Sequence, residues 1–429
     1  MTDLLAISTA VIDGQTSTAE VGPMNRINFE LSEIADHIAI VEAFSHCVLF
    51  ETNDGLLAFD TSGVQGGERV VAAIRNWCTE PLHSIIYTHG HLDHVGGCGA
   101  FMKDAMERGY ANPRVIAHEN VPQRFDRYQF TDGYNRSINR RQFGQFSRHG
   151  YEIQHGNTFL PDGVARPELT YRESLDLDIG GMAVKLYHAK GETDDHTWAW
   201  IPDRKAICAG DFFIWCFPNA GNPQKVQRYP LEWGLAMRDM AETGAELFLP
   251  AHGLPIQGKE RIKGVLTDVA DSLEFLVKET VARMNEGTRL DEIVHEVKLD
   301  STTMEKPYLQ PIYDEPEFVV RNIWRLYGGW YDGNPAYLKP APESELALEL
   351  ANLAGGALNL AERSHVLMQS NPRLACHLAE LAVQADPENK DLHEVRAQVY
   401  QHRRTIESSL MAKGIYGSAA NESRDKLSS

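Results

Sequence analysis

The sequence predicts a layered α/β domain, in which helices cover two β-sheets, followed by an all-α domain. Short β-forming apolar runs alternate with helical stretches between residues 37 and 250, whereas the pattern is helical from about Lys259 nearly to the C-terminus. The chain of 429 residues is longer than one typical domain, and residues 331–344 are rich in Pro and Gly. We therefore expect an α/β domain over residues 1–300 and a helical domain over residues 301–429, with an internal boundary near the Pro- and Gly-rich stretch.

The first strands are predicted in residues 37–62, where two apolar runs are broken at Asn53-Asp54-Gly55, a hairpin signal. Apolar residues at helical spacing follow in "GERVVAAIRNWC" (67–78). The next run, "HSIIYT" (83–88), is typical of a short buried strand. This order of strand, helix and strand leads the chain directly into His89.

A second group of strands is predicted from about Leu175 to Leu249, in "MAVKLYHA", "TWAWIP", "KAICAGD" and "AELFLPAHG". In the helical part, residues 374–404 have the small-residue spacing and the Asp-Pro turn of a tetratricopeptide-like helix pair. One such pair cannot bury its own apolar face, so it must pack on another element.

Charge and composition exclude several classes of protein. The chain has 41 basic and 60 acidic residues, a net charge of −19, which opposes attraction to nucleic acid or anionic lipid. The first residues lack the features of a secretory signal, and no apolar run is long enough to span a bilayer, so we expect a cytoplasmic protein with no membrane association. The six cysteines form no CxxC pair, which indicates neither a zinc ribbon nor a disulfide scaffold.

A metal site is predicted by "YTHGHLDHVGG" (87–97), which places His89, His91, Asp93 and His94 within six positions. In an extended segment, His89 and His91 point to one side, and Asp93 with His94 reaches a neighbouring position. Two adjacent metals fit this arrangement better than one. Since a zinc ion usually takes about four N, O or S ligands, two ions need more ligands than this stretch offers.

Further ligands are available in "HAKGETDDH" (188–196), "AGD" (209–211) and "PAHG" (250–253), each near the end of a predicted strand. His188 and His196 are candidates either for a ligand or for a partner that holds a carboxylate. Asp211 is a candidate ligand or, alternatively, the N-cap of a following helix. His252 lies between Ala251 and Gly253 and has no obvious structural task.

The order of HGHLDH, GET, AGD and PAHG resembles the metallo-β-lactamase superfamily over about residues 24–260. The resemblance implies an αββα sandwich with a dinuclear metal site. Glu192 stands where most members have a histidine, which resembles the alkylsulfatase branch. "WRLYGGWYDGNPAYLKP" (324–340), "LAGGALNLAERS" (353–364) and "KGIYGSAANE" (413–422) resemble the helical dimerization domain of that branch, so a homodimer is expected.

The resemblance assigns the metal ligands. The first metal would take His89, His91 and Glu192, which we favour over His188. The second would take Asp93, His94 and His252, and Asp211 would bridge the two. Asp93 and Asp211 are also the candidate catalytic carboxylates. We expect two divalent ions per chain, zinc or else manganese or iron, because three carboxylates weaken the preference for zinc. Such ions lower the pKa of bound water to about 7 and make it a nucleophile for hydrolysis.

The resemblance also implies the substrate. "YNRSINRRQFGQF" (134–146) is similar to an Asn-containing, double-arginine segment of the branch, so Asn139, Arg140 and Arg141 are candidates for binding an anionic group. The alternative is a solvated basic turn. We expect hydrolysis of alkyl or aryl sulfate esters that releases inorganic sulfate. The alternatives are a lactone, phosphoester or β-lactam hydrolase on the same fold, or a catalytically idle scaffold whose helices bind a protein. Full-length members also carry a sterol-carrier-like domain, which this sequence does not reach, so shorter alkyl chains are the expected substrates.

Overall fold

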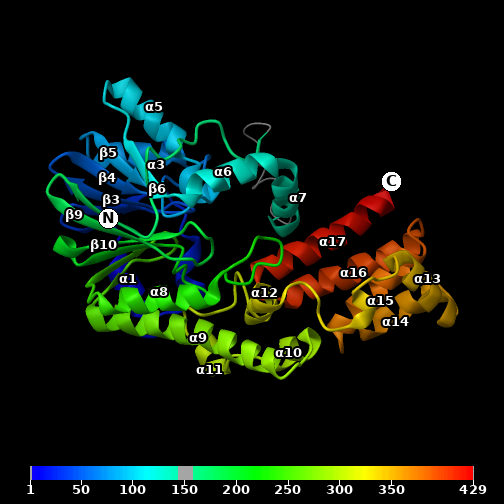
Figure 1. The fold of residues 1–429 in the computed structure, drawn as a ribbon. Coiled ribbons are helices and arrows are strands. Elements are labelled where there is room, and N and C mark those ends of the chain that lie inside the picture. Colours follow the sequence, from blue (N-terminus) through cyan, green and yellow to red (C-terminus); the bar gives the residue numbers. More distant parts are fainter. Residues whose placement is uncertain (1, 144–157, 429) are drawn as a thin grey trace. The chain divides into compact units, whose positions relative to one another are not determined.

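The computed structural model describes residues 2–143 and 158–428 (Figure 1). The chain divides into two compact units. Unit 1 comprises residues 1–132, 155–288 and 292–329, and unit 2 comprises residues 133–154, 289–291 and 330–429. The domain limits of 1–300 and 301–429 stay predictions.

The first sheet of unit 1 follows the order of the sequence. Its strands are β1 (Leu31–Ala35), β2 (Ile38–Val41), β3 (Cys47–Thr52), β4 (Gly55–Phe59), β5 (Leu82–Ile86), β6 (Arg114–His118) and β7 (Leu169–Tyr171). Neighbours are antiparallel from β1 to β4 and parallel from β4 to β7. The predicted hairpin joins β3 to β4, where Thr52 pairs with Gly55. The positive φ of 112° at Gly55 explains why a glycine closes this turn.

The second sheet has the order β13-β12-β11-β10-β9-β8. Its strands are β8 (Ser174–Ile179), β9 (Met182–His188), β10 (Thr197–Ile201), β11 (Ala206–Gly210), β12 (Leu247–Pro250) and β13 (Ile256–Gln257). Only β11 and β12 pair in parallel. Because the carboxyl ends of parallel strands lie at the same edge, Asp211 after β11 and His252 after β12 emerge side by side.

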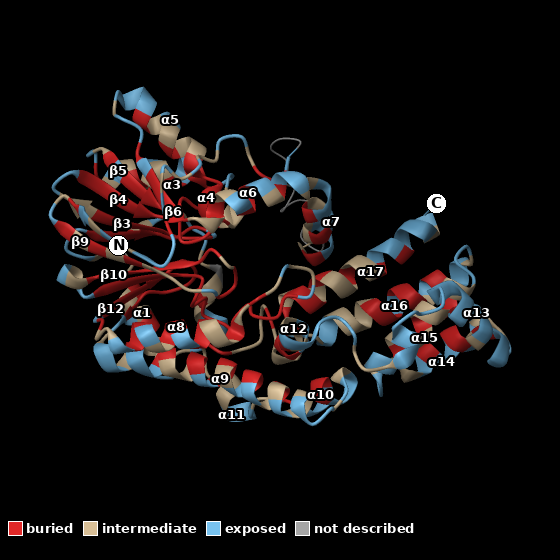
Figure 2. Cartoon of the chain, viewed as in Figure 1, coloured by how far each residue is buried: buried red, intermediate tan, exposed pale blue. Residues whose placement is uncertain are grey.

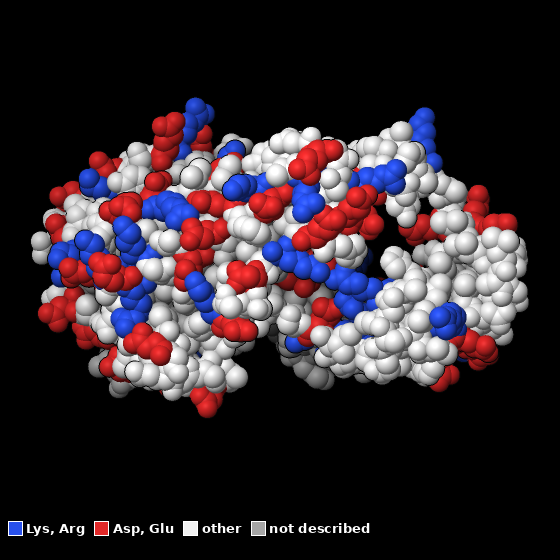
Figure 3. All heavy atoms as spheres, turned by 90° about the horizontal axis from the view of Figure 1, so that it is seen from below, with Lys and Arg blue, Asp and Glu red and all other residues white. Residues whose placement is uncertain are grey.

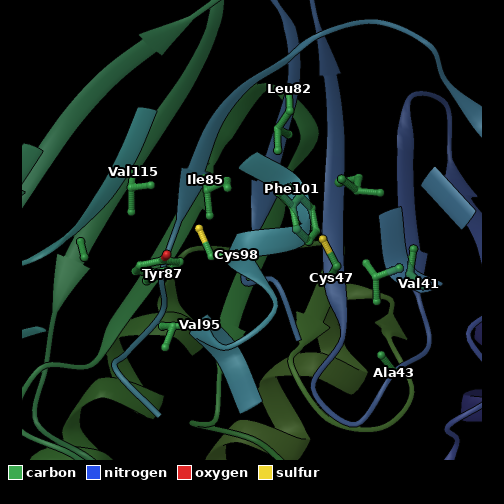
Figure 4. Close-up of a cluster of buried hydrophobic side chains, with 14 of the residues drawn as sticks. Val41, Ala43, Cys47, Leu82, Ile85, Tyr87, Val95, Cys98, Phe101 and Val115 are labelled. Carbon is green, nitrogen blue, oxygen red and sulfur yellow. The ribbon is translucent and has the colours of Figure 1, made fainter. Parts of the chain in front are cut away.

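Alternating strand residues build two cores, which confirms the predicted αββα sandwich. Ile38 and Ile40 face the second sheet and pack with residues such as Val184 and Leu186. Ala39 and Val41, one position on, face the helices that cover the other side of the sheet. Figure 4 shows part of that second cluster, with Cys47, Tyr87, Cys98 and Phe101. The inner strands β2, β4, β11 and β12 are accordingly wholly buried, whereas the edge strands β1, β7 and β8 also carry partly exposed or exposed residues (Figure 2).

Helices cover both outer faces of the sandwich. The helical segments of unit 1 are α1 (Leu4–Ile12), α2 (Thr18–Val21), η1 (Pro23–Asn25), α3 (Gly67–Trp77), α4 (Leu92–Val95), α5 (Cys98–Arg108), α6 (Asn120–Phe130), η2 (Pro202–Arg204), α8 (Pro230–Glu242), α9 (Lys259–Asn285), α11 (Ser301–Met304) and α12 (Pro316–Gly328), with most of α10 (Leu290–Glu296). Within the described ranges, no helix has the length and apolarity needed to cross a bilayer.

Charged side chains of both signs are interspersed over the face seen in Figure 3. Ion pairs join neighbouring helices: Arg238 on α8 lies 2.9 Å from Glu274 on α9, and Lys263 lies 2.8 Å from Glu242. Exposed pairs of this type each contribute less than about 1 kcal/mol, so the apolar cores rather than these pairs hold the layers together.

Unit 2 is helical. It contains α7 (Asp132–Phe143), η3 (Pro335–Tyr337), α13 (Glu343–Leu353), α14 (Ala357–Leu367), α15 (Pro372–Ala385), α16 (Lys390–Ile406) and α17 (Leu410–Ser428). The predicted helix pair is α15 with α16, and it packs on α13, α14 and α17. Helix α7 meets α17 at Gly414, where a Cβ would lie 1.6 Å from the carbonyl oxygen of Gln142. Only glycine allows this approach.

Candidate metal centre

The HGHLDH motif follows β5 at the edge of the first sheet. The prediction that the whole motif is extended is wrong, because the one-turn helix α4 begins at Leu92. Leu92 packs against the buried cluster and Val95 is fully buried within it, so this turn has an apolar side that anchors it. Asp93 and His94 lie on this turn. Their side chains therefore join a different group of potential ligands from those of His89 and His91.

The structure brings the seven sequence-predicted ligands into two adjoining groups. They are His89, His91, Glu192 and Asp211 in one group and Asp93, His94 and His252 in the other. His91 Nδ1 lies 3.6 Å from Glu192 Oε1, and His252 Nε2 lies 3.4 Å from Asp93 Oδ2. His89 is the exception to this spacing, since its Nε2 lies only 2.8 Å from His91 Nδ1.

These separations fit divalent ions. Four donors at about 2.0–2.3 Å from a tetrahedral zinc ion are about 3.3–3.8 Å from one another. His94 Nε2 lies 3.5 Å from Asp93 Oδ2 and 3.3 Å from Asp211 Oδ1. Neither His94 Nε2 nor Asp211 Oδ1 has a hydrogen-bond partner, although both atoms are buried. Buried polar atoms left in this state need a cation or another ligand between them.

Asp211 contacts both groups. Its Oδ1 lies 3.3 Å from His252 Nε2, and its Oδ2 lies 3.8 Å from His89 Nε2. The backbone N–H of Asp211 donates to Nε2 of buried His196 at 3.1 Å, so His196 fixes the start of the loop. The alternative role of Asp211 as a helix N-cap is wrong, because no described helix begins between β11 and α8.

Glu192 and His188 occupy different surroundings. Glu192 is buried, accepts a hydrogen bond from the Asn219 amide and lies 3.2 Å from Nη2 of Arg228. His188 donates through Nδ1 to the carbonyl of His196 at 2.9 Å, and its ring stacks on His118. Of the two residues, only Glu192 lies in one of the two groups of potential ligands.

Two buried carboxylates hold the HGHLDH motif. Asp60 Oδ2 lies 2.7 Å from His94 Nδ1, and its carboxylate also accepts the N–H and the hydroxyl of Thr88 at 2.7 Å each. Asp195 accepts the N–H of Gly90 at 3.1 Å. A ligand histidine whose second nitrogen meets a carboxylate is fixed in tautomer and orientation, so His94 presents Nε2 to the site.

Burial and neighbouring charges together set the pKa values of the site. Burial lowers the pKa of His89 and His91 well below the usual value for histidine, so both rings are neutral donors. Burial also raises the pKa of Glu192 to about 8, against the opposing effect of Arg228. For Asp211, burial favours the neutral acid, but His94 and His252 outweigh it and hold the pKa well below its usual range.

Sequence reasoning missed the cations next to these ligands. Arg228 has a side chain only 1% exposed, and its Nε and Nη1 atoms have no hydrogen-bond partner. Lys225 is half-buried. Burial lowers the pKa of this lysine to about 7; the positive charge of Arg228 lowers it further, and the carboxylate of Glu192 acts in the opposite direction. Both residues come from "NPQKVQRY" (222–229), a stretch without a motif or periodicity that could have marked it.

The predicted substrate-binding residues Asn139, Arg140 and Arg141 lie on α7, in unit 2. The Asn139 amide donates to the carbonyl of Asn135 at 2.8 Å, one turn earlier in the helix. Residues 144–146 of the same predicted segment lie outside the described residues. A role of these three residues in binding an anion therefore stays a prediction.

Known families and proteins share this architecture. Residues 41–252 match the model of the metallo-beta-lactamase superfamily, and residues 289–426 match that of alkyl sulfatase dimerisation. A linear primary-alkylsulfatase of Pseudomonas sp. (strain ATCC 19151) is 26% identical over 88% of this chain and 74% of its own length. An (R)-specific secondary-alkylsulfatase of Pseudomonas sp. is 23% identical over 89% of this chain and 60% of its own length.

Among solved structures, the stereoselective inverting sec-alkylsulfatase Pisa1 from Pseudomonas sp. has a TM-score of 0.80 to this chain at 21% identity. The match covers 92% of this chain and 65% of that one. The likeness extends over both the sandwich and the helical part. The chain thus spans about three quarters of the first relative and less than two thirds of the other two.

Proposed function

Because this chain belongs to the metallo-beta-lactamase superfamily and carries an alkyl sulfatase dimerisation domain, we propose that it is a metal-dependent hydrolase of alkyl or aryl sulfate esters. The reaction adds water to the ester and releases an alcohol and inorganic sulfate. Alkylsulfatase relatives that align over nearly nine tenths of the chain support this assignment.

The donor set supports two divalent ions per chain, with zinc as the first candidate and manganese or iron as alternatives. When bound, such a pair supplies a Lewis acid and activates water at neutral pH. The protein's part is to hold the donors in place, with Asp211 within reach of both groups and Asp60 behind His94. As acidic residues at the centre, Asp93 and Asp211 are the candidate catalytic carboxylates.

One observation favours a sulfate ester over a neutral substrate: the guanidinium group of Arg228 lacks hydrogen-bond acceptors for two of its nitrogen atoms. This group is buried beside Glu192. A buried cation with free N–H groups is costly unless an anion accepts from them. The planar fork of arginine matches two oxygens of a tetrahedral sulfate.

Asn139, Arg140 and Arg141 remain candidates for a second anion contact. Their resemblance to the double-arginine segment of the branch supports this role. If they bind the sulfate group, Arg140→Ala with Arg141→Ala lowers kcat/KM by about thirty- to a thousandfold at unchanged metal content, equal to roughly 2–4 kcal/mol. An unchanged kcat/KM leaves Arg228 as the proposed anchor of the anion.

The decisive experiment is a hydrolysis screen of metal-replete protein with alkyl sulfates, aryl sulfates, phosphodiesters, lactones and β-lactams. Release of inorganic sulfate supports the proposal. Hydrolysis of lactones, phosphodiesters or β-lactams without release of sulfate assigns the same site to another reaction. A protein that binds metal but hydrolyses none of these compounds favours the idle scaffold.

The proposed partner is a second copy of the chain. Helices α13 and α14 expose Leu348 (52%), Leu353 (77%), Leu358 (49%) and Val366 (65%). Apolar side chains gathered on one segment mark an interaction surface, and the dimerisation model covers it. Light scattering at micromolar concentration is expected to give the mass of a dimer, and a monomer mass contradicts this proposal. The cytoplasmic location stays a prediction that fractionation of the source cells tests.

A further inference from the structure

Arg228 lies in a loop, so no helix or strand of its own fixes its position. Between the end of β11 and the start of α8, the described chain forms neither helix nor strand. A long loop without secondary structure needs contacts from elsewhere to hold a buried charge in one place. Those contacts come from the segment around α12, about ninety residues further along the chain.

Asn322 on α12 binds the backbone of Arg228 from both sides. Its Nδ2 donates to the carbonyl of Arg228 at 3.0 Å, and its Oδ1 accepts the N–H of Arg228 at 3.4 Å. The side chain is 4% exposed, so water does not compete for these bonds. One amide group therefore fixes both peptide groups of Arg228, the one before its side chain and the one after it.

The same amide holds the neighbours of Arg228. Gln227 donates to Asn322 Oδ1 at 3.0 Å, and Arg325, one turn later on α12, donates to Gln227 Oε1 at 2.9 Å. Earlier in the loop, the N–H of Gly221 donates to buried Asp314 at 2.6 Å. A Cβ on Gly221 would lie 2.3 Å from the backbone nitrogen of Val319 at the start of α12. The second half of the loop, from Gly221 to Arg228, is thus held by residues 314–325.

We propose that Asn322 is a positioning residue for the anion-binding site, which acts by orienting Arg228 toward the anionic group of the substrate. This inference rests on one part of the proposed function, namely that Arg228 binds an anion. It gives the matched dimerisation segment a second task, since α12 lies within residues 289–426 of that match yet folds as part of unit 1.

The test uses the full-length, metal-replete protein and two variants of Asn322. Asn322→Leu removes both hydrogen-bonding groups at similar size, and Asn322→Asp keeps the acceptor but loses the donor. The control is Arg321→Ala on the same helix, because Arg321 is 51% exposed and pairs only loosely with Glu317 at 3.7 Å. Binding of inorganic sulfate is measured by titration calorimetry, and KM and kcat are measured with octyl sulfate.

We expect the Kd of sulfate to rise about tenfold or more in Asn322→Leu, which corresponds to about 1.4 kcal/mol of binding free energy. Because Asn322 orients a group that binds the substrate, KM should rise by a larger factor than kcat falls. The metal content of all the variants should equal that of the wild type. Arg321→Ala should also bind sulfate with the affinity of the wild type. If Asn322→Leu does not fold, Asn322→Asp must show the rise. A folded Asn322 variant with wild-type affinity for sulfate overturns the inference. If the wild type binds sulfate but hydrolyses no sulfate ester, the proposed function fails while this comparison still decides the role of Asn322.

Discussion

Arg124 on α6 donates through Nε to Oδ2 of Asp195 at 2.6 Å, and both side chains are almost completely buried. The same oxygen of Asp195 accepts the N–H of Gly90, the residue between the ligand candidates His89 and His91. The ion pair thus connects a helix on the outside of the sandwich to the metal-binding motif. Arg124 also crowds Gly90, where a Cβ would lie 2.8 Å from Cδ of the arginine.

The first prediction concerns this buried pair. Asp195→Asn removes the buried partner of Arg124 and leaves it only the more exposed carboxylate of Asp194, so we expect the free energy of unfolding to fall by about 3 kcal/mol. Denaturant unfolding measures the change. The matched control is Asp126→Asn, which breaks the exposed pair of Asp126 with Arg166 and should cost less than about 1 kcal/mol. Equal effects at the two positions would show that Asp195 contributes no more than a surface pair.

The second prediction concerns metal content. Elemental analysis should find about two divalent ions per chain, and a chelator should abolish hydrolysis. Glu192→Gln keeps the size of the side chain but removes its charge, so we expect loss of metal or a fall in rate of about tenfold or more. His188→Asn, which alters a residue outside both groups of potential ligands, should be much milder. The reverse ranking moves the ligand to His188.

The third prediction concerns Arg228. Arg228→Ala removes the buried fork beside Glu192, and we expect kcat/KM for a sulfate ester to fall by an amount equal to about 2–4 kcal/mol. Arg228→Lys restores the charge without the bidentate geometry and should recover only part of the loss. Metal analysis of both variants separates an effect on the anion from an effect through Glu192. Full activity of Arg228→Ala on sulfate esters is the outcome that contradicts this role.

The fourth prediction concerns the dependence of stability on pH. His118 is buried, accepts the N–H of Asn120 at Nδ1 and donates from Nε2 to the carbonyl of Arg172, which suits the neutral ring. Burial and the stacked ring of His188 lower the pKa of His118 from 6.5 to about 4. Between these values the unfolded chain binds more protons than the folded one, so this contribution to stability is present above pH 6.5 and is lost as the pH falls through 4.

His118→Asn removes this titration. The slope of the unfolding free energy against pH should therefore be smaller in the variant than in the wild type between pH 4 and 6.5, which denaturant unfolding at several pH values measures. Comparing the two proteins cancels the contributions of the metal-site histidines, which they share. Identical slopes would show that His118 does not couple folding to protons.

Local patterns made much of this protein predictable from its sequence. The β3–β4 hairpin follows from three consecutive turn residues, and α3 follows from apolar residues at helical spacing, because both depend on neighbours along the chain. The ligand candidates were found in short motifs near the ends of predicted strands, and the resemblance to a known family divided them between two metals. The error at Leu92, where the motif turns into a helix, arose because contacts with the core decide that turn.

The contacts that give the site its orientation were decided only by the tertiary structure. Asp60 and His94 are 34 residues apart in the sequence, Arg124 and Asp195 are 71 apart, and Arg228 and Asn322 are 94 apart. At least one residue of each pair, namely Asp60, Arg124, Arg228 or Asn322, lies in a stretch that carries no motif. Burial is what makes these pairs strong: a charge or an amide removed from water must find its partner within the protein, and that partner is set by the packing of the sheets and of α12, not by distance along the chain.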